Sequence, residues 1–402
     1  MTAKEKVLQY IDEHEGEILR VAGDLIRVPS ISGRDDANEQ YHRMADYLIA
    51  EFGRFGIPAV KHAREGGGCN LVAEIRGSGT GKTFAMGGHY DVVAADEPDW
   101  TTEGGFVPTV RDGKLIGRGA ADMKGGLAAC FVALTALRAC GVAPAGTVQF
   151  IATVDEEIGG PNGMDHLVTA GIINPDFFVN AEQTEMKIIT AYKGCAWMEV
   201  TVKGVSAHGS KPELGVNAVV NAAKLISRIH EKGVAYTPDP LLGDGSLNIG
   251  AIRSGSAINV VPDECVFNID GRFVPGQTYD GVIGELRAII AELEDEDETF
   301  RAEITFCSRC TNATVIPDDS DLVKSLLLNS EAVYGAASEL GGFIAAGDNC
   351  LFHRKGVPAL MYGPGGLGCI HKANEWVDIH ELTKAAKIYA MAAIDLTKGS
   401  LD

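Results

Sequence analysis

Three consecutive acidic residues follow an apolar segment of the chain. Asp155, Glu156 and Glu157 come directly after residues 147–154, whose mostly apolar side chains predict a buried strand. Neighbouring carboxylates repel one another, and burying even one of them without a partner is unfavourable. Unless this turn is simply exposed to solvent, a cation is expected beside it.

A histidine and an aspartate follow a second predicted strand, residues 83–88. His89 and Asp91 are two residues apart, so in an extended chain their side chains face the same way. This spacing suits a metal ligand and the carboxylate that orients it. A surface histidine beside an aspartate would have the same pattern.

Three further residues stand in comparable places. Asp122 lies in the glycine-rich loop Gly117–Gly126, before an apolar helix, although it could also be a helix N-cap. Glu182 follows the predicted strand 177–179, and His371 follows the glycine-rich segment 363–368. In open α/β sheets, ligands bind beyond the carboxyl ends of the strands. The sequence therefore predicts that these side chains meet.

Two histidines with several carboxylates suit a pair of divalent ions, zinc most readily, with cobalt or manganese possible. One carboxylate must then bridge the ions, and another must stay off them to act as a base toward water. The neighbouring residues Glu156 and Glu157 can supply both a base and a ligand.

The periodicity of the chain predicts how these residues are positioned. Residues 3–28 have helical periodicity, and strands then alternate with helices, which indicates an α/β fold with a mixed sheet. Residues 192–306 predict the order β-α-β-β-α-β of a ferredoxin-like domain. We therefore expect a catalytic domain of residues 1–191 and 307–402, interrupted by an inserted domain of residues 192–306.

Composition excludes several classes of function. The 402 residues are 46% hydrophobic and 22% charged, as in globular proteins. A chain of this length is too long for one ordinary hydrophobic core. A net charge of −20 disfavours binding to nucleic acid or an anionic membrane. The sequence starts without the apolar region of a secretory signal, and its nine cysteines have no disulfide-framework spacing. These features favour a cytoplasmic location.

Taken together, these motifs resemble the M20 family of metallopeptidases and deacylases, which includes acetylornithine deacetylase, succinyl-diaminopimelate desuccinylase, aminoacylase and carboxypeptidase G. The resemblance covers nearly the whole chain, with the motifs in the family's order. It implies five metal ligands: His89 and Glu182 for one ion, Glu157 and His371 for the other, and Asp122 bridging both.

The resemblance also implies roles for residues that do not bind metal. Glu156 would be the general base, and Asp91 would orient His89. The inserted domain would be a lid that dimerises, so that His208 reaches the partner's active site and stabilises the developing oxyanion. Asn259 would contact the substrate, and Arg272 would bind a substrate carboxylate.

The chain departs from the family pattern at two positions. Gln183 stands where a proline is usual, and Gly271 stands where an aliphatic residue is common. Both leave the implied ligands in place. A glutamate at position 182 resembles the deacylase and aminoacylase members more than the aminopeptidases and carboxypeptidases.

The sequence therefore predicts a homodimeric metallohydrolase. It would cleave the amide bond of a small N-acyl amino acid carrying a carboxylate, using water activated by two metals, with Glu156 as base. A di- or carboxypeptidase of the same family, or an enzyme that removes an amine or carbamoyl group, remains an alternative. A catalytically silent metal-binding protein is disfavoured because all the ligand positions and the base are present.

Overall fold

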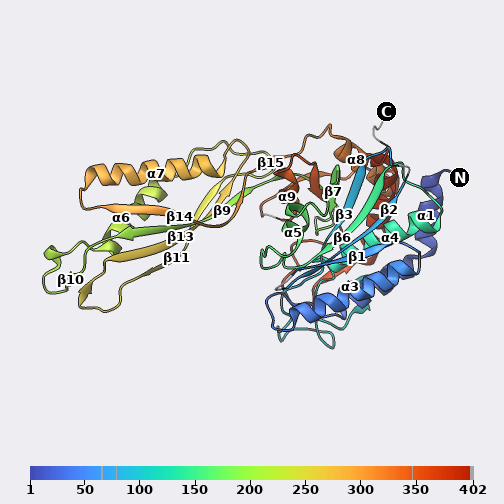
Figure 1. Cartoon of the computed structure of the whole chain (residues 1–402), viewed down its shortest axis with the longest axis horizontal. Helices are drawn as coiled ribbons and strands as arrows, with labels where there is room; N and C mark the ends of the chain where they lie inside the picture. Colours follow the sequence, from blue (N-terminus) through green and yellow to red (C-terminus); the bar gives the residue numbers. More distant parts are fainter. Residues whose placement is uncertain (65–66, 78, 346, 399–402) are drawn as a thin grey trace. The chain divides into compact units, whose positions relative to one another are not determined.

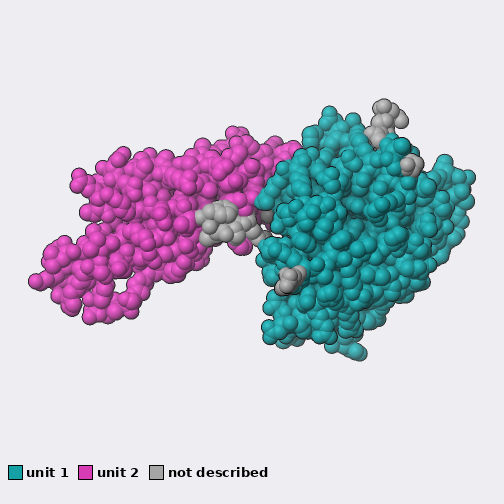
Figure 2. Space-filling view, viewed as in Figure 1, with its two compact units in different colours: residues 1–190, 316–341, 347–402 teal, residues 191–315, 342–346 magenta. Residues whose placement is uncertain are grey.

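The computed structural model describes residues 1–64, 67–77, 79–345 and 347–398. The chain divides into two compact units: the first is Met1–Thr190, Ile316–Gly341 and Gly347–Asp402, and the second is Ala191–Val315 and Gly342–Ala346 (Figure 2). The long segment of the second unit ends at Val315 rather than at the predicted residue 306. The reason is that its last long strand, β14 (Arg301–Thr311), extends beyond that residue.

The first unit contains the helices α1 (Ala3–Glu13), α2 (Glu15–Ile26), α3 (Ala37–Gly53), α4 (Lys124–Ala139), α5 (Met164–Thr169), α8 (Asp321–Tyr334), α9 (Asn349–His353) and α10 (Ile379–Leu396). The large sheet contains β1 (Ala59–Ala63), β2 (Cys69–Arg76), β3 (Thr83–His89), β6 (Thr147–Thr153), β7 (Phe177–Asn180), β8 (Ile188–Tyr192), β15 (Thr314–Val315), β16 (Leu340–Phe343) and β17 (Ala359–Met361). A small sheet contains β4 (Thr109–Arg111), β5 (Lys114–Ile116) and β18 (Trp376–Asp378).

The large sheet is mixed. Its order is β1-β2-β6-β3-β7-β17-β8-β15, with β16 also paired to β8. The central strands β6, β3, β7 and β17 are parallel, whereas β1, β2 and β8 pair antiparallel to their neighbours. An α/β fold with a mixed sheet is what the sequence predicts.

Helices cover both faces of this sheet (Figure 1). Phe150 in β6 packs with Phe52 of α3, which in turn contacts Phe131 of the buried helix α4. The next residue, Ile151, belongs to a second cluster with residues of α5 and α9. Successive residues of a strand point to opposite faces, so the two clusters form two core layers.

The helix predicted over residues 3–28 is in fact two helices. α1 ends at Glu13 and α2 begins at Glu15, with His14 between them. The ring of His14 stacks on Tyr10, and its Nδ1 lies 2.8 Å from the Tyr10 carbonyl oxygen. That oxygen would otherwise accept the next helical hydrogen bond, so the side chain of His14 competes with continuation of the helix.

The second unit is a four-stranded antiparallel sheet of order β11-β13-β9-β14, packed against two helices. Its elements are β9 (Gly194–Lys203), β10 (Ala207–His208), η1 (Pro212–Leu214), α6 (Ala218–Lys232), β11 (Ser246–Ser254), β12 (Val260–Val261), β13 (Glu264–Phe273), α7 (Tyr279–Glu296) and β14. The long elements follow the order β-α-β-β-α-β.

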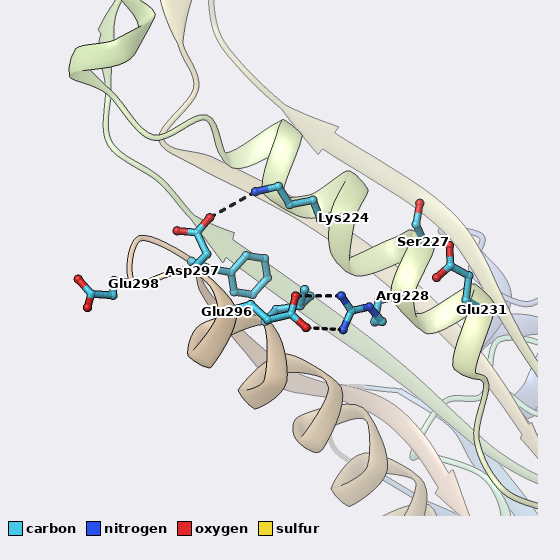
Figure 3. A pocket seen from close by; sticks show the side chains of 9 residues that line it. Lys224, Ser227, Arg228, Glu231, Glu296, Asp297 and Glu298 are labelled. Atoms are coloured by element: carbon cyan, nitrogen blue, oxygen red, sulfur yellow. Dashed lines mark hydrogen bonds and ion pairs between the residues drawn. The ribbon is translucent and has the colours of Figure 1, made fainter.

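A pocket opens between α6 and the end of α7 in this unit (Figure 3). Lys224 lies 3.3 Å from Asp297, and Arg228 makes two hydrogen bonds of 3.0 and 2.9 Å to Glu296. Both cationic side chains that line the pocket thus have carboxylate partners.

In the part of the chain that the structure describes, no helix is long and apolar enough to cross a membrane.

Gly126 in α4 lets this helix approach the sheet edge closely, which generates a prediction. A Cβ atom at this position would lie 2.1 Å from the carbonyl oxygen of Ala181, next to Glu182. We expect Gly126→Ala to lower the free energy of unfolding by ~1–3 kcal/mol, because the helix must shift. Chemical denaturation measures this change.

Gly16 in α2 provides a matched control. A Cβ atom there meets nothing within 4 Å. Gly16→Ala should therefore stabilise the protein by up to about 1 kcal/mol, because alanine favours the helix. Equal effects of the two substitutions would contradict the close packing of α4.

Candidate metal centre

The parallel strands of the large sheet end level with one another. His89 at the end of β3 is opposite Thr153 at the end of β6. Asn180 at the end of β7 is opposite Gly87 of β3 and Met361 of β17. The segments that follow these strands therefore leave the sheet at one edge, and they carry most of the predicted ligands.

One cluster consists of His89, Asp122 and Glu182. The Nε2 atom of His89 lies 3.2 Å from Asp122 Oδ1 and 3.4 Å from Glu182 Oε1. All three residues are buried, and their ligand atoms lie within 4.8 Å of one another. This distance allows one small cation to contact all three.

A second cluster consists of Asp122, Glu157 and His371. The Nε2 atom of His371 lies 3.2 Å from Asp122 Oδ2 and 3.1 Å from Glu157 Oε2. Asp122 thus turns one oxygen toward each histidine and belongs to both clusters. The structure brings together all five residues predicted as ligands.

Two buried atoms in these clusters have unused bonding capacity. Neither His89 Nε2 nor Glu157 Oε1 makes a hydrogen bond of acceptable geometry. Buried polar atoms are normally paired, and an orphan atom requires an explanation. Imidazole nitrogen and carboxylate oxygen are both zinc ligands, so the donor set fits a divalent cation at each cluster.

The charges in the clusters shift one another's pKa values. Burial lowers the pKa of His89, but Glu182, Asp122 and Asp91 outweigh it and raise that pKa well above its ordinary value. Hydrogen bonding to Asp122 and Glu157 raises the pKa of His371 to about 10. Burial raises the pKa of Glu182, and His89 offsets this only in part. The two clusters therefore both favour positive charge at their centres.

Glu156 lies beside the first cluster without belonging to either one. Its Oε2 is 4.0 Å from His89 Nε2, and its side chain is 19% exposed. Burial raises the pKa of Glu156 well above its usual range, although His89 lowers it. A carboxylate with a raised pKa beside a metal centre can both accept and return a proton.

Asp91 connects the two strand ends. Its carboxylate accepts hydrogen bonds from the backbone N–H groups of Glu156 and Glu157, at 3.3 and 3.2 Å, and from the Ser32 hydroxyl. It also lies 3.4 Å from His89 Nδ1, which is 3.0 Å from the Asp91 carbonyl oxygen. Asp91 therefore holds two things in place: the turn that carries Glu156 and Glu157, and the ring of His89.

Asp155 faces away from the clusters. Its oxygens accept hydrogen bonds from the Tyr41 hydroxyl at 3.1 Å and from Asn162 Nδ2 at 2.7 Å. Its φ of 62° lies in the left-handed region. Asp155 is one of the residue types that tolerate this conformation, and it holds the turn in place.

Three residues with predicted roles lie in the second unit. His208 is in β10, which pairs with β12, and the N–H of Gly209 donates to the Asn259 carbonyl oxygen at 2.8 Å. His208 and Asn259 therefore share one two-stranded arm. Arg272 lies on β13 and is paired with Asp270, with its Nε 2.8 Å from Oδ1.

The sequence did not point to the contact of Ser32 with Asp91 or to the pairing of Asp270 with Arg272. It also did not point to Glu375, whose Oε1 accepts a hydrogen bond from the N–H of Asp122 at 2.9 Å. Ser32 and Glu375 contact Asp91 and the Asp122 loop, respectively, but lie far from them in the chain. The pairing of Asp270 with Arg272 is different, because residues two apart on a strand face the same way, so the spacing could have indicated it. Gly271 between them leaves room for the Phe273 ring, which would lie 2.8 Å from a Cβ atom at that position.

Comparison with known proteins agrees with this geometry. Residues 85–395 match Peptidase family M20/M25/M40, which is well over half of the chain. The chain belongs to this family. It is therefore a metallohydrolase of a group whose members act on linear amide bonds.

Curated relatives span nearly the same length. The acetylornithine deacetylase of Myxococcus xanthus is 30% identical over 338 residues, covering 82% of this chain and 84% of that protein. A probable succinyl-diaminopimelate desuccinylase of Staphylococcus aureus is 29% identical over 360 residues, covering 82% and 86%.

Solved structures share the fold. A dinuclear metal-binding peptidase of the M20 family from Bacillus subtilis matches with a TM-score of 0.72 and 17% identity. The match covers 97% of this chain and 100% of that one. An identity this low supports the fold and leaves the substrate open.

The contacts of Asp91 generate a prediction. Asp91→Asn would turn an amide N–H₂ group toward the N–H of Glu156 or Glu157. Because the loss of such a hydrogen bond is worth ~1–3 kcal/mol, we expect these two amides to exchange with solvent roughly tenfold faster or more. Hydrogen exchange with mass spectrometry of peptides covering residues 150–160 measures this rate.

Ser32→Ala is the matched control. It removes one donor to Asp91 but leaves the carboxylate and both backbone hydrogen bonds intact. Exchange at residues 156 and 157 should change much less in this variant. Unchanged exchange in Asp91→Asn would show that the turn is held by other contacts.

Proposed function

We propose that this protein is a deacylase that hydrolyses the amide bond of a small N-acyl amino acid with a free carboxylate. One observation carries the proposal: Asp122 belongs to both ligand clusters, while Glu156 stands next to them and belongs to neither. Relatives named as an acetylornithine deacetylase and a probable desuccinylase support this substrate class.

The five clustered side chains would hold two divalent ions. His89 and Glu182 would bind one ion, Glu157 and His371 the other, and Asp122 both. Zinc suits this set of nitrogen and oxygen donors best, and cobalt or manganese would also be accepted. When bound, the ions would polarise the substrate carbonyl and lower the pKa of a water molecule.

Glu156 would carry the proton in this reaction. Its carboxylate accepts a proton from the attacking water and later donates it to the leaving amine. Burial raises its pKa above the usual range of a carboxylate, which favours return of the proton to the leaving amine. Asp91 would keep Glu156 in place through the backbone hydrogen bond described above.

His208 would stabilise the negative charge that develops on the carbonyl oxygen. Its Nδ1 lies 2.8 Å from the Ser210 hydroxyl oxygen and 3.2 Å from the Ser210 backbone nitrogen. In the tautomer with the proton on Nε2, Nδ1 accepts from Ser210 and Nε2 can donate to an oxyanion. Asn259 on the same arm would contact the substrate, and Arg272 would bind its carboxylate.

We propose that the protein is a homodimer, in which the second unit forms the interface and His208 acts in the partner's active site. Several large apolar side chains of this unit are exposed, and a dimer interface that brought them together would remove them from water. They are Val205, Leu214, Val219, Val220, Ile252 and Ile258, of which Ile258 is fully exposed.

Substituting Glu156 tests the mechanism. Glu156→Gln should lower kcat by ~10²–10⁴-fold or more, because the amide cannot accept the proton. Elemental analysis should still find both ions. The substrates are a panel of N-acetyl and N-succinyl amino acids and dipeptides, with EDTA-treated enzyme as a blank.

Asp155→Asn is the control on the same turn. It alters a residue that faces Tyr41 and Asn162, so it should lower the melting temperature and leave kcat nearly unchanged. Near-normal turnover by Glu156→Gln would overturn the assignment of the base. Hydrolysis restricted to dipeptides would identify a peptidase instead of a deacylase.

The role of His208 is tested by mixing two variants. His208→Ala alone should lose ~10²–10³-fold in kcat, because an oxyanion donor is missing. Co-expression with Glu156→Gln should restore about a quarter of wild-type activity, because half of random dimers are mixed and each of these has one complete site.

Two results would contradict this arrangement. Recovery would be absent if His208 acted within its own subunit. Light scattering that showed a fully active monomer would exclude the dimer altogether. Ser210→Ala removes the hydroxyl 2.8 Å from His208 Nδ1 but keeps the backbone N–H, so it should lower kcat much less than His208→Ala.

A further inference from the structure

The two histidines of the clusters are held in different ways. His89 is 1% exposed and ends a central strand, and Asp91 fixes its Nδ1 atom. The side chain of His371 is 47% exposed, and its φ of 55° lies in the left-handed region. Packing around its ring therefore constrains His371 little, so its position depends on its contacts with Asp122 and Glu157 and on those of the neighbouring backbone.

Glu375, four residues after His371, makes such contacts. Its side chain is fully buried. One oxygen, Oε1, accepts hydrogen bonds from three backbone N–H groups: Gly119 at 3.1 Å, Ala121 at 2.9 Å and Asp122 at 2.9 Å. The Glu375 carbonyl oxygen also accepts the N–H of Gly117 at 2.9 Å. Glu375 thus holds the backbone of the loop that contains Asp122.

Arg118 completes the network from the same loop. It is 1% exposed, and its Nη1 lies 2.7 Å from Glu375 Oε2 and 3.3 Å from the Lys372 carbonyl oxygen. Its Nε donates to the Ala94 carbonyl oxygen at 3.0 Å, and its Nη2 to Glu97. Arg118 therefore connects the Asp122 loop with the segments that follow Asp91 and His371.

We propose that Arg118 and Glu375 are positioning residues for the cluster Asp122–Glu157–His371, setting the separation of His371 from Asp122. The inference rests on the proposed function in one respect, that this cluster binds a metal ion. Neither residue belongs to a ligand cluster, and the oxygens of Glu375 and the nitrogens of Arg118 all have backbone or side-chain partners.

The chemistry of the pair fits positioning better than simple stabilisation. A buried ion pair often contributes little stability compared with apolar side chains of the same size, but its directional hydrogen bonds fix geometry. The planar guanidinium and the carboxylate together reach three chain segments with defined directions. Residues that orient metal ligands typically change metal affinity by ~10–100-fold when they are substituted.

Glu375→Gln tests this proposal because it keeps the shape of the side chain and removes its charge. The amide would turn an N–H₂ group toward Arg118 or toward the backbone donors. EDTA-treated protein is titrated with Co²⁺ and followed by calorimetry and visible absorption. We expect the affinity for one of two ions to fall by ~10–100-fold.

The ion at His89, Asp122 and Glu182 should be affected less, because Asp122 is its one ligand on the loop that Glu375 holds, whereas the other cluster contains both Asp122 and His371. A residue with a merely structural role would lower the melting temperature without changing the affinity of the folded protein for Co²⁺.

Glu51→Gln provides the control for loss of a charge-paired carboxylate. Glu51 in α3 pairs with Arg20 and Arg54, distant from the clusters in sequence, and its side chain is 13% exposed. This variant should lower the melting temperature and leave both Co²⁺ affinities unchanged.

Arg118→Lys is a second test variant, for the case that Glu375→Gln does not fold. It keeps the positive charge but loses the forked contacts, and it should show the same selective loss of Co²⁺ affinity.

Two Co²⁺ ions bound with wild-type affinity by folded Glu375→Gln, or by folded Arg118→Lys, would overturn the proposal. A different result would contradict the proposed function: wild-type protein that binds no pair of ions, or that hydrolyses no amide of the panel. Binding of two ions by wild-type protein that lacks hydrolytic activity would still allow the positioning role to be tested, because its readout is metal affinity.

Discussion

The structure depends on the concentration of negative charge at one buried edge of the large sheet. Asp122, Glu157 and Glu182 converge there, with Glu156 beside them, and two imidazoles face them. Such charges are unfavourable in a low-dielectric environment unless cations balance them. Parallel strands that end level with one another bring these residues together, and Asp122 shares its two oxygens between two sites.

Other carboxylates around this edge are balanced differently. Asp91, Asp155 and Glu375 accept hydrogen bonds from backbone N–H groups, hydroxyls, an amide or a guanidinium. These three hold the loops, whereas the carboxylates of the clusters retain oxygens that face the centre. The partners of each acid thus separate residues that shape the site from residues that would bind metal.

Much of this arrangement could be predicted from local sequence. His89, Glu157 and Glu182 follow predicted apolar strands, and Asp122 and His371 lie in or after glycine-rich segments. Local sequence therefore indicated these positions, and the resemblance to the M20 family implied their roles as ligands. The partners of Glu375 and Asp91 could not be found in this way, because hydrogen bonds between residues 253 or 59 positions apart leave no periodic signal.

Boundaries were also harder to predict than sites. Helical periodicity continues across His14, so it cannot show that the His14 side chain interrupts the helix at the Tyr10 carbonyl. The second unit extends to Val315 because β14 continues to Thr311, and strand propensity alone does not fix where pairing ends.

The order of strands has a consequence for synthesis of the chain. β7 and β8 are separated by seven residues in sequence, Ala181–Lys187, yet β17 lies between them in the sheet. The large sheet therefore cannot be completed until residue 361 has left the ribosome. The second cluster cannot form until His371 has been synthesised. Among the described residues, the four long strands of the second unit pair with one another, and they are complete by Thr311. The inserted unit can thus finish its sheet while the unit that holds the clusters is still open.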